Sequence, residues 1–291
     1  MTNEAGGDAP ERDPDLAVVV LSYGPRPTLV GAVRSLLTQD DRTEIVVVHS
    51  GGGELPDALV SQPRVQVVVS PDRLLPGAAR NLGIASTRAA FVAFLADDCL
   101  ASPGWVRHRV SLHRAGVSAV ASALTCHKPR SPIALAAHLS LYFRRMPGAD
   151  PALALRYGVS YTRALFERYG VFRDDLESGE DTEFNQRLAA HDAPAWAPEV
   201  VTVHIGPETL PAFFQAQWRR GQRMAIAWRA LGAYSPTKVA GNALSRTATI
   251  LNEMWRVVES RAFGVAILSV PLIVCGNIMY ACGALAARTR S

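Results

Sequence analysis

The chain has 291 residues, enough for one large domain or two small ones with a sizeable core. Its formal net charge of +4 is too small to indicate a nucleic-acid-binding protein. The four cysteines form no CxxC pair and no metal-ligand spacing with histidine, so we expect free thiols in a reducing compartment.

Residues 1–15 are acidic and hold no apolar run, which predicts a disordered tail and no secretory signal. An apolar strand is then expected at Leu16 to Ser22, followed by a turn and an amphipathic helix from Arg26 to Thr38. Further apolar strands are expected at Glu44 to Val48 and at Val65 to Ser70. This alternation of strands and helices predicts an α/β domain with a parallel sheet.

The second strand ends in a glycine-rich turn, His49 to Glu54, where the backbone can approach a ligand closely. A phosphate-binding P-loop would need a following Lys-Ser or Lys-Thr, and the turn has neither. A plain flexible turn is the alternative interpretation.

The central stretch combines a helix over Gly77 to Arg88, a buried strand over Ala90 to Leu95, and two carboxylates, Asp97 and Asp98, at the strand end. Adjacent carboxylates repel each other and are costly to desolvate together, and a divalent cation removes that cost. Hard oxygen ligands suit Mg²⁺ or Mn²⁺, and ligands of open α/β sheets bind beyond the carboxyl ends of strands. We therefore predict a metal site, with a solvated turn before a helix starting near Pro103 as the alternative.

The next segments predict smaller elements. A helix is expected from Trp105 to about Ala115, an apolar run follows at Val117 to Leu124, and a short strand is expected at Gly158 to Tyr161 before a helix from Thr162 to Tyr169. The apolar stretch Ile133 to Phe143 is compatible with an acceptor-side loop, a surface helix or a membrane-contacting element.

An acidic helix start follows in Leu176 to Leu188, where Glu180, Asp181 and Glu183 occupy the expected first turn. Negative charge at that position is stabilised by the helix dipole, so a solvated acidic terminus is one interpretation. The other makes Asp181 a general base above a site.

The strand Val200 to His204 ends in a histidine that is either structural or a ligand. A helix from Thr209 to Leu231 mixes aromatic residues with arginines, which fits a core-packed helix with a basic face or an interfacial helix.

Taken in order, the chain resembles a family 2 glycosyltransferase of the GT-A fold over roughly Leu16 to Arg229. The resemblance rests on the ordered motifs GAARNLGIA, FLADDCLASPGW, GEDTEFNQRL, a strand ending in histidine, and QWRRG. It implies an α/β fold with a mostly parallel sheet flanked by helices. It also implies inverting transfer from a nucleotide-diphosphate sugar to an acceptor hydroxyl, with Mg²⁺ or Mn²⁺ as cofactor.

The resemblance also implies roles for particular residues. Asp97, Asp98 and His204 correspond to the metal-binding positions, and Asp181 with Glu180 corresponds to the motif that supplies the catalytic base. The positions implied in donor binding are Ser22, Tyr23, His49, Ser50, Arg80, Asp97, Gln217 and Arg220. The chain departs from the family pattern at Ala96, where many relatives have the first Asp of Asp-x-Asp, and at His49 to Gly52, where many have Asp-Asn-Gly-Ser.

The C-terminal stretch Ala262 to Ala287 is apolar and uncharged, and it exceeds the roughly 20 residues needed to span a bilayer core. We expect a transmembrane helix, with a kinked or re-entrant segment and an interfacial or protein-packing helix as alternatives. Arg256 and Arg261 before it are balanced by Arg288 and Arg290 after it, so the positive-inside rule gives no orientation. The expected location is the plasma membrane or inner membrane, with a cytoplasmic catalytic domain because activated sugars are made there.

The expected organisation is a tail at 1–15, a catalytic domain at 16–232, a helical linker at 233–261 and the membrane segment at 262–287. Expected partners are the donor, a glycan or lipid-linked acceptor, and the membrane. A non-catalytic GT-A-like scaffold and a nucleotidyltransferase are the competing classes. The retained acidic residues argue against the scaffold, and the poor phosphate loop in SYGPRP argues against the nucleotidyltransferase.

Overall fold

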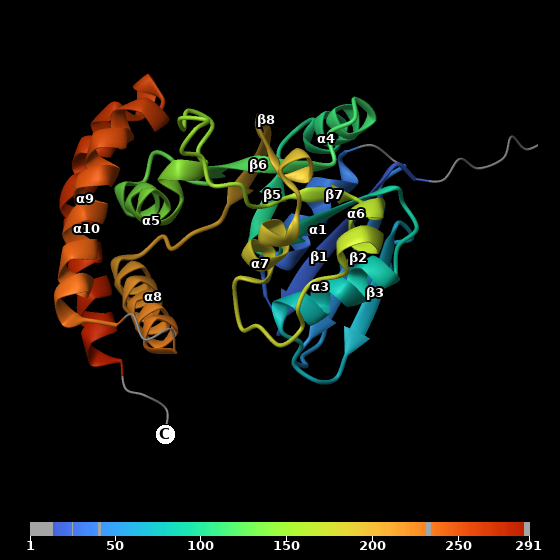
Figure 1. Cartoon of the computed structure of the whole chain (residues 1–291), viewed down its shortest axis with the longest axis horizontal. Coiled ribbons are helices and arrows are strands. Elements are labelled where there is room, and N and C mark those ends of the chain that lie inside the picture. Colours follow the sequence, from blue (N-terminus) through green and yellow to red (C-terminus); the bar gives the residue numbers. More distant parts are fainter. Residues whose placement is uncertain (1–13, 25, 40–41, 231–233, 288–291) are drawn as a thin grey trace, which may run out of the picture. The chain divides into compact units, whose positions relative to one another are not determined.

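The computed structural model describes residues 14–24, 26–39, 42–230 and 234–287 (Figure 1). Most of the expected tail, and the two arginines at 288 and 290, lie outside these residues. The chain divides into two compact units. The sheet unit is the described part of Met1–Asp97 with Pro103–Ala121 and Gly158–Ala195, and the helical unit is Asp98–Ser102, Ser122–Tyr157 and the described part of Trp196–Ser291.

The sheet unit is built on four parallel strands in the order β3-β2-β1-β4. These are β1 (Leu16–Tyr23), β2 (Glu44–Ser50), β3 (Val65–Ser70) and β4 (Phe91–Ala96). Residues 16–20 of β1 are almost fully buried, as expected for a strand covered on both faces. Antiparallel neighbours follow: β7 (Ser160–Thr162) pairs with β4, and the first residues of β6 (Ala119–Cys126) pair with β7.

Helices and one 3₁₀ turn complete this unit. They are α1 (Leu29–Leu37), α2 (Asp57–Val60), α3 (Pro76–Ala85), α4 (Trp105–Arg114), α6 (Arg163–Tyr169), α7 (Glu180–Arg187) and η2 (Ala190–Asp192). The predicted α/β class is confirmed. The parallel pairing predicted from the apolar strands holds for β1 to β4, and the added strands make the sheet mixed.

The helical unit contains the last residues of β6, the strand β8 (Ala195–His204) and the short strand β5 (Cys99–Ala101), which pairs antiparallel with β8. Its helices are α5 (Pro132–Tyr142), η1 (Phe143–Arg145), α8 (Leu210–Ala230), α9 (Pro236–Val257), η3 (Ser260–Ala262) and α10 (Phe263–Ala286). The apolar stretch Ile133 to Phe143, for which the sequence allows a loop, a surface helix or a membrane-contacting element, forms α5 and the first residue of η1. Most of α5 is buried.

The four long helices share one apolar core in the helical unit. Leu139 of α5, Phe213 of α8, Ile250 of α9 and Ile273 of α10 are all fully buried in it. The expected linker is largely the helix α9, which packs along α10 in this unit (Figure 1). The division into a catalytic domain and a membrane segment stays a prediction.

Among the described residues, the segment Ser260–Ala286 is the one helix long and apolar enough to cross a membrane. One side of α10 packs inward through Ala266, Ile273, Gly276, Tyr280 and Gly283. A stripe on its other side is exposed and wholly apolar, and we call it the α10 outer face: Ile267, Leu268, Val274, Ile278 and Leu285.

Candidate active site

The carboxyl ends of β1 and β2 carry a hydrogen-bonded pair in the sheet unit. His49 Nε2 lies 3.2 Å from the carbonyl oxygen of Gly52, and His49 Nδ1 lies 3.2 Å from Ser22 Oγ. A carbonyl only accepts, so Nε2 is the donor toward Gly52, while the Ser22 hydroxyl is bonded to Nδ1. These two hydrogen bonds orient the His49 ring and hold the glycine-rich turn against the strand ends.

An exposed aromatic ring stands beside this turn. Tyr23 ends β1 and is 48% exposed, and the guanidinium of Arg73 lies 5.2 Å from the centre of its ring. Gly51 adopts a φ of 81°, and a Cβ there would lie 2.3 Å from Tyr23 Cε2, so no other residue fits without a shift. Ser50 closes the turn by accepting the backbone N–H of Gly24 at 3.0 Å. Four of the predicted donor-binding residues, Ser22, Tyr23, His49 and Ser50, are therefore gathered at one edge.

Asp97 follows β4 directly and is the last residue of this part of the sheet unit. Its carboxylate lies 3.7 Å from Arg26 Nε, and its surroundings leave it only 7% exposed. The predicted strand-end position of this carboxylate is confirmed.

The acidic start of α7 holds two neighbouring carboxylates in different ways. Glu180 is buried and accepts a 3.0 Å charged hydrogen bond from Arg80 Nε. The Arg80 guanidinium lies over the rings of Phe94 and Phe172, at 4.7 and 5.4 Å. The structure thus places Arg80 against α7, and its predicted contact with the nucleotide stays a prediction.

Helix α3 fixes the loop that leads into α7. The Asn81 side chain donates to the carbonyl of Phe172 at 2.8 Å and accepts that residue's N–H at 3.0 Å. One turn earlier, Gly77 lies so close to Arg173 that a Cβ would be 1.8 Å from its carbonyl oxygen. The motif GAARNLG therefore works as a platform for the acidic helix.

Asp181 is half-buried, and its Oδ1 accepts the N–H of Thr182 at 2.7 Å. Below it, Tyr161 donates to Asn185 of α7 at 2.8 Å from within a cluster of phenylalanine rings. Burial raises the pKa of Tyr161, and the carboxylates of Asp181 and Glu180 raise it further. Tyr161 stays protonated and acts as a fixed hydrogen-bond donor under the helix.

In the helical unit, Asp98 and His204 lie beside each other. Strands β5 and β8 pair Cys99 with His204, and the Ile205 N–H donates to the Asp98 carbonyl at 2.8 Å. This register leaves Asp98 Oδ2 4.0 Å from His204 Nε2. The pKa of His204 is lowered chiefly by burial, so the ring is neutral at neutral pH and can offer a lone pair.

The His204 ring has neighbours that the motifs did not indicate. Tyr142, at the end of α5, meets it edge-on with ring centres 4.8 Å apart, and His138 lies 6.2 Å away. Burial raises the pKa of Tyr142 to about 12 and lowers that of His138 to about 3. Arg145 stacks on Tyr142 at 5.7 Å and adds positive charge beside His204. The only sequence signal for this group was the segment LYFRR closing an apolar run.

Gln217 and Arg220 both lie on α8 of the helical unit. Arg220 donates to the carbonyl of Ser140 at 2.9 Å and lies 4.8 Å from the centre of the Tyr280 ring. Burial, followed by the nearby Arg246, lowers the pKa of Arg220 to about 9, so it remains charged at neutral pH. Gln217 is buried, and its Oε1 has no hydrogen-bond partner among the described residues.

The acidic and histidine residues provide a partial metal site. Within the described parts of the chain, no three His, Cys, Asp or Glu side chains gather into a group that could hold a cation alone. The Asp98 carboxylate and the His204 Nε2 lone pair do fit a divalent ion that takes its remaining ligands from substrate phosphates and water. Nε2 is the His204 nitrogen that faces Asp98. The other ring nitrogen, Nδ1, is buried and has no hydrogen-bond partner among the described residues.

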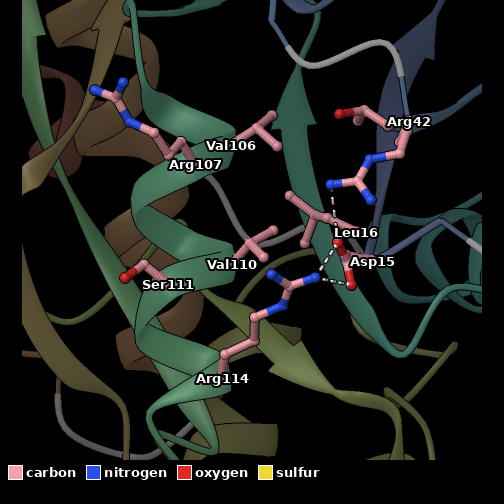
Figure 2. A pocket seen from close by; sticks show the side chains of 9 residues that line it. Asp15, Leu16, Arg42, Val106, Arg107, Val110, Ser111 and Arg114 are labelled. Atoms are coloured by element: carbon pink, nitrogen blue, oxygen red, sulfur yellow. Dashed lines mark hydrogen bonds and ion pairs between the residues drawn. The ribbon is translucent and has the colours of Figure 1, made fainter.

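A separate cavity of about 310 Å³ lies at the amino end of β1. Figure 2 shows Arg42 and Arg114 pointing toward Asp15 while Arg107 points away. Ligands of α/β sheets bind at the carboxyl ends of strands, so this cavity is not part of the candidate site.

Comparison with known proteins shows the family and the fold. The family model described as glycosyl transferase family 2 matches residues 17–161. The succinoglycan biosynthesis protein ExoO of Rhizobium meliloti is 34% identical over 104 residues, which are 34% of this chain and 30% of that protein.

Two solved structures share the fold. The mannosyltransferase PcManGT of Pyrobaculum calidifontis, in complex with GDP-Man and Mn²⁺, has a TM-score of 0.56 at 18% identity and covers 95% of this chain and 88% of its own. Residues 1–349 of S. aureus TarS give a TM-score of 0.53 at 16% identity, with coverages of 93% and 89%. Sequence motifs, topology and these matches agree, and we conclude that residues 17–161 belong to glycosyl transferase family 2 and that the chain has the GT-A fold.

Proposed function

We propose that the protein transfers a sugar from a nucleotide diphosphate to an acceptor hydroxyl with inversion at the anomeric carbon, and that a divalent cation is required. The observation that carries this proposal is the Asp98 carboxylate 4.0 Å from the neutral His204 ring. A scaffold protein has no need to hold an imidazole nitrogen beside this carboxylate.

Asp98 and His204 would hold the cation, and Asp97 is the third candidate ligand. A bound Mg²⁺ or Mn²⁺ supplies positive charge that stabilises the leaving diphosphate. The complex of PcManGT with Mn²⁺ supports a metal of this kind. Arg220 and Arg145 are the positively charged residues that we propose to bind the same diphosphate. Gln217 lies near Arg220 on α8 and is proposed to bind the donor with it.

The base is proposed to be Asp181. Its neighbour Glu180 forms an ion pair with Arg80. Asp181 is therefore the carboxylate of the pair that we propose to accept the proton. As the acceptor oxygen attacks the anomeric carbon, its proton passes to an Asp181 carboxylate oxygen. The bond from that carbon to the phosphate oxygen breaks, and its electron pair leaves with the diphosphate. A single displacement of this kind inverts the configuration.

The nucleotide is proposed to bind at the edge formed by Ser22, Tyr23, His49 and Ser50. Tyr23 offers an exposed flat ring for stacking against a base, and the Arg73 guanidinium above it offers positive charge. GDP-Man and UDP-GlcNAc, which appear in the complexes of PcManGT and TarS, are the first donors to test.

Membrane association is proposed through the α10 outer face. Residues 209–287 contain eight Arg or Lys and only two Glu, so this segment carries a charge of +6 in a chain of +4. Helix α10 packs along its length on α8 and α9, which carry most of those charges. A span would draw them into the bilayer, so an interfacial position with the outer face in the lipid suits the fold better. A glycan or lipid-linked acceptor of the cell envelope, met at the cytoplasmic face of the plasma or inner membrane, is consistent with this position.

The test is a four-way titration of donor binding, using GDP-Man and UDP-GlcNAc with wild type and Asp98→Asn, each with Mn²⁺ and with chelator. We expect binding only by wild type with Mn²⁺, and release of nucleoside diphosphate from that mixture. Asp57→Asn, an exposed carboxylate on α2, is the control. Equal affinity in all four mixtures would remove the metal from the proposal.

A further inference from the structure

The helical unit contains a cavity of about 680 Å³, within the size range of small-molecule sites. It is bounded by the end of β6, the loop before α5, the turn at Pro147 and Gly148, and the connection from α9 to α10. Gly148 packs against the backbone of Arg256, which ties the turn to the end of α9. The mechanism proposed above does not use this space.

One part of the cavity lining is apolar and the other part is charged. Its apolar wall includes the buried side chains of Leu135, Met146 and Val257. Its rim carries three arginines and one glutamate. Among the described lining residues none is aromatic and none is Asn, Gln, Asp or His. Such a lining offers few partners for sugar hydroxyl groups but suits an apolar chain that ends in an anion.

The three rim arginines differ in how far their charge is already neutralised. Arg256 lies 3.5 Å from Asp150 and 3.6 Å from Glu253, and Arg261 pairs with Glu259. Arg130, in the loop after β6, is exposed and makes no hydrogen bond or ion pair with any described residue. Arg130 is therefore the rim cation most available to a ligand.

The cavity wall belongs to the same strand pair as His204. Val201 lines the cavity three residues before His204 on β8, and Cys126 lines it at the end of β6. The next residue, His127, donates its backbone N–H to the His204 carbonyl at 3.1 Å. A ligand in the cavity thus lies along the strands that carry the proposed metal ligand.

We propose that this cavity binds the acceptor of the proposed transfer, and that the acceptor carries a lipid phosphate. The inference rests on the proposed function. The apolar chain lies against the Leu135 and Val257 wall, and the phosphate accepts hydrogen bonds from Arg130. The cavity adjoins the start of α10, where the outer face begins, so a long chain can continue from it into the bilayer.

Protection of Cys126 from alkylation tests the binding without any enzymatic reaction. Burial raises the pKa of the Cys126 thiol, so iodoacetamide is used at alkaline pH, and the modified peptides are quantified by mass spectrometry. Octyl phosphate, below its micelle concentration, is expected to protect Cys126 and to leave Cys275 and Cys282 on α10 reactive. Octanol and inorganic phosphate, used at the same concentration, are expected to protect much less.

Arg130→Gln should weaken protection by octyl phosphate roughly tenfold, the size expected for loss of one charged hydrogen bond. Lys128→Gln is the matched control, because Lys128 lies in the same loop and pairs with Glu208 outside the cavity. Equal protection by octanol, no protection by any compound, or unchanged binding by Arg130→Gln would each overturn the proposal. Stronger protection by GDP or UDP would assign the cavity to the donor and overturn it as well.

Failure of this inference is distinguishable from failure of the proposed function. Metal-dependent hydrolysis of a nucleotide sugar needs no acceptor, so wild type that hydrolyses donor but shows no Cys126 protection loses only the acceptor site. Wild type that shows protection but never binds or cleaves a donor keeps a lipid-phosphate site and loses the transfer reaction.

Discussion

Glu180 and Asp181 are adjacent, yet the fold gives them different surroundings. Glu180 is 5% exposed and bound to Arg80, so removing its charge would leave a half-buried guanidinium unpaired. Asp181 hydrogen-bonds to its neighbour Thr182 and lies in the first turn of α7, where the helix dipole attracts negative charge. The pair therefore combines one ion-paired carboxylate, Glu180, with Asp181, the carboxylate that we propose as the base.

Asp181→Asn is expected to lower kcat by at least about 100-fold while changing donor affinity only a few-fold. The amide is nearly isosteric and is itself accepted at helix starts, so the fold should be retained. Steady-state kinetics together with donor titration would measure both quantities. Near-normal turnover would return the residue to a structural role and direct the search for a base to Glu183. Loss of donor binding would place Asp181 on the donor side.

The site residues could be recognised singly from the sequence, but their partners could not. The acidic pair after β4 and the acidic start of α7 follow from local patterns, and the structure has both. The contact of Arg80 with Glu180 joins residues 100 positions apart, and the approach of Tyr142 to His204 depends on where α5 lies. Long-range contacts of this kind leave no local periodicity to detect.

At the scale of elements, α3 is the helix whose small residues matter most. Gly77→Ala is expected to destabilise the sheet unit by about 1–3 kcal/mol, because the new methyl would overlap the Arg173 carbonyl and push α3 away from the loop before α7. The change would be measured by urea unfolding. Gly241→Ala in α9 is the matched control, because a Cβ there meets nothing within 4 Å.

That control should behave in the opposite direction, with a gain of about 0.5–1 kcal/mol, since alanine is the better residue inside a helix. Equal effects of the two substitutions would mean that the packing of α3 on Arg173 does not limit the residue at position 77.

A second element-scale prediction concerns the α10 outer face. Ile278 is 55% exposed, so Ile278→Asp should leave the helical core intact. It should weaken sedimentation with vesicles of mixed anionic and neutral lipids at least about tenfold, the loss expected for one large apolar side chain. Ala248→Asp, on the exposed side of α9, is the control for added charge. Unchanged vesicle binding by Ile278→Asp would exclude the outer face as the lipid-contacting surface.

The elements were predictable to different degrees for physical reasons. Strands β1 to β4 are long apolar runs bounded by turn residues, and all four were expected close to their observed limits. The three-residue strand β5 was not expected, because so short a segment has no pattern of its own. Nor could the sequence show which side of α10 packs inward, since every side of that helix is apolar.

At the scale of the whole molecule, acid is expected to destabilise the protein through buried histidines. Arg109 donates to Ser160 Oγ at 2.9 Å, Ser160 lies 2.8 Å from His113 Nε2, and His113 Nδ1 donates to the Val117 carbonyl at 2.7 Å. This arrangement requires a neutral His113 ring. Burial lowers the pKa of His113 to about 4, below the ordinary value of 6.5.

The unfolded chain binds a proton at His113 near pH 6.5, whereas the folded chain does so only near pH 4. Stability from the neutral ring is therefore complete above pH 6.5 and is lost as the pH falls through that interval, at up to about 1.4 kcal/mol per pH unit. Urea midpoints across this range should fall for wild type and fall less for His113→Gln. The exposed His127→Gln is the control, and parallel curves for wild type and His113→Gln would contradict the assignment.

The close packing of α3 also affects how relatives of this protein should be found. In GAARNLG, the two glycines, the arginine and the asparagine all serve the scaffold: they touch Arg173, Val19, Glu180 and Phe172. A descendant that lost its chemistry would be expected to keep these four residues, because each replacement would destabilise the fold. A homology search seeded with this motif would collect active and inactive proteins alike. On the proposed mechanism, only the joint presence of Asp98, Asp181 and His204 would separate the two.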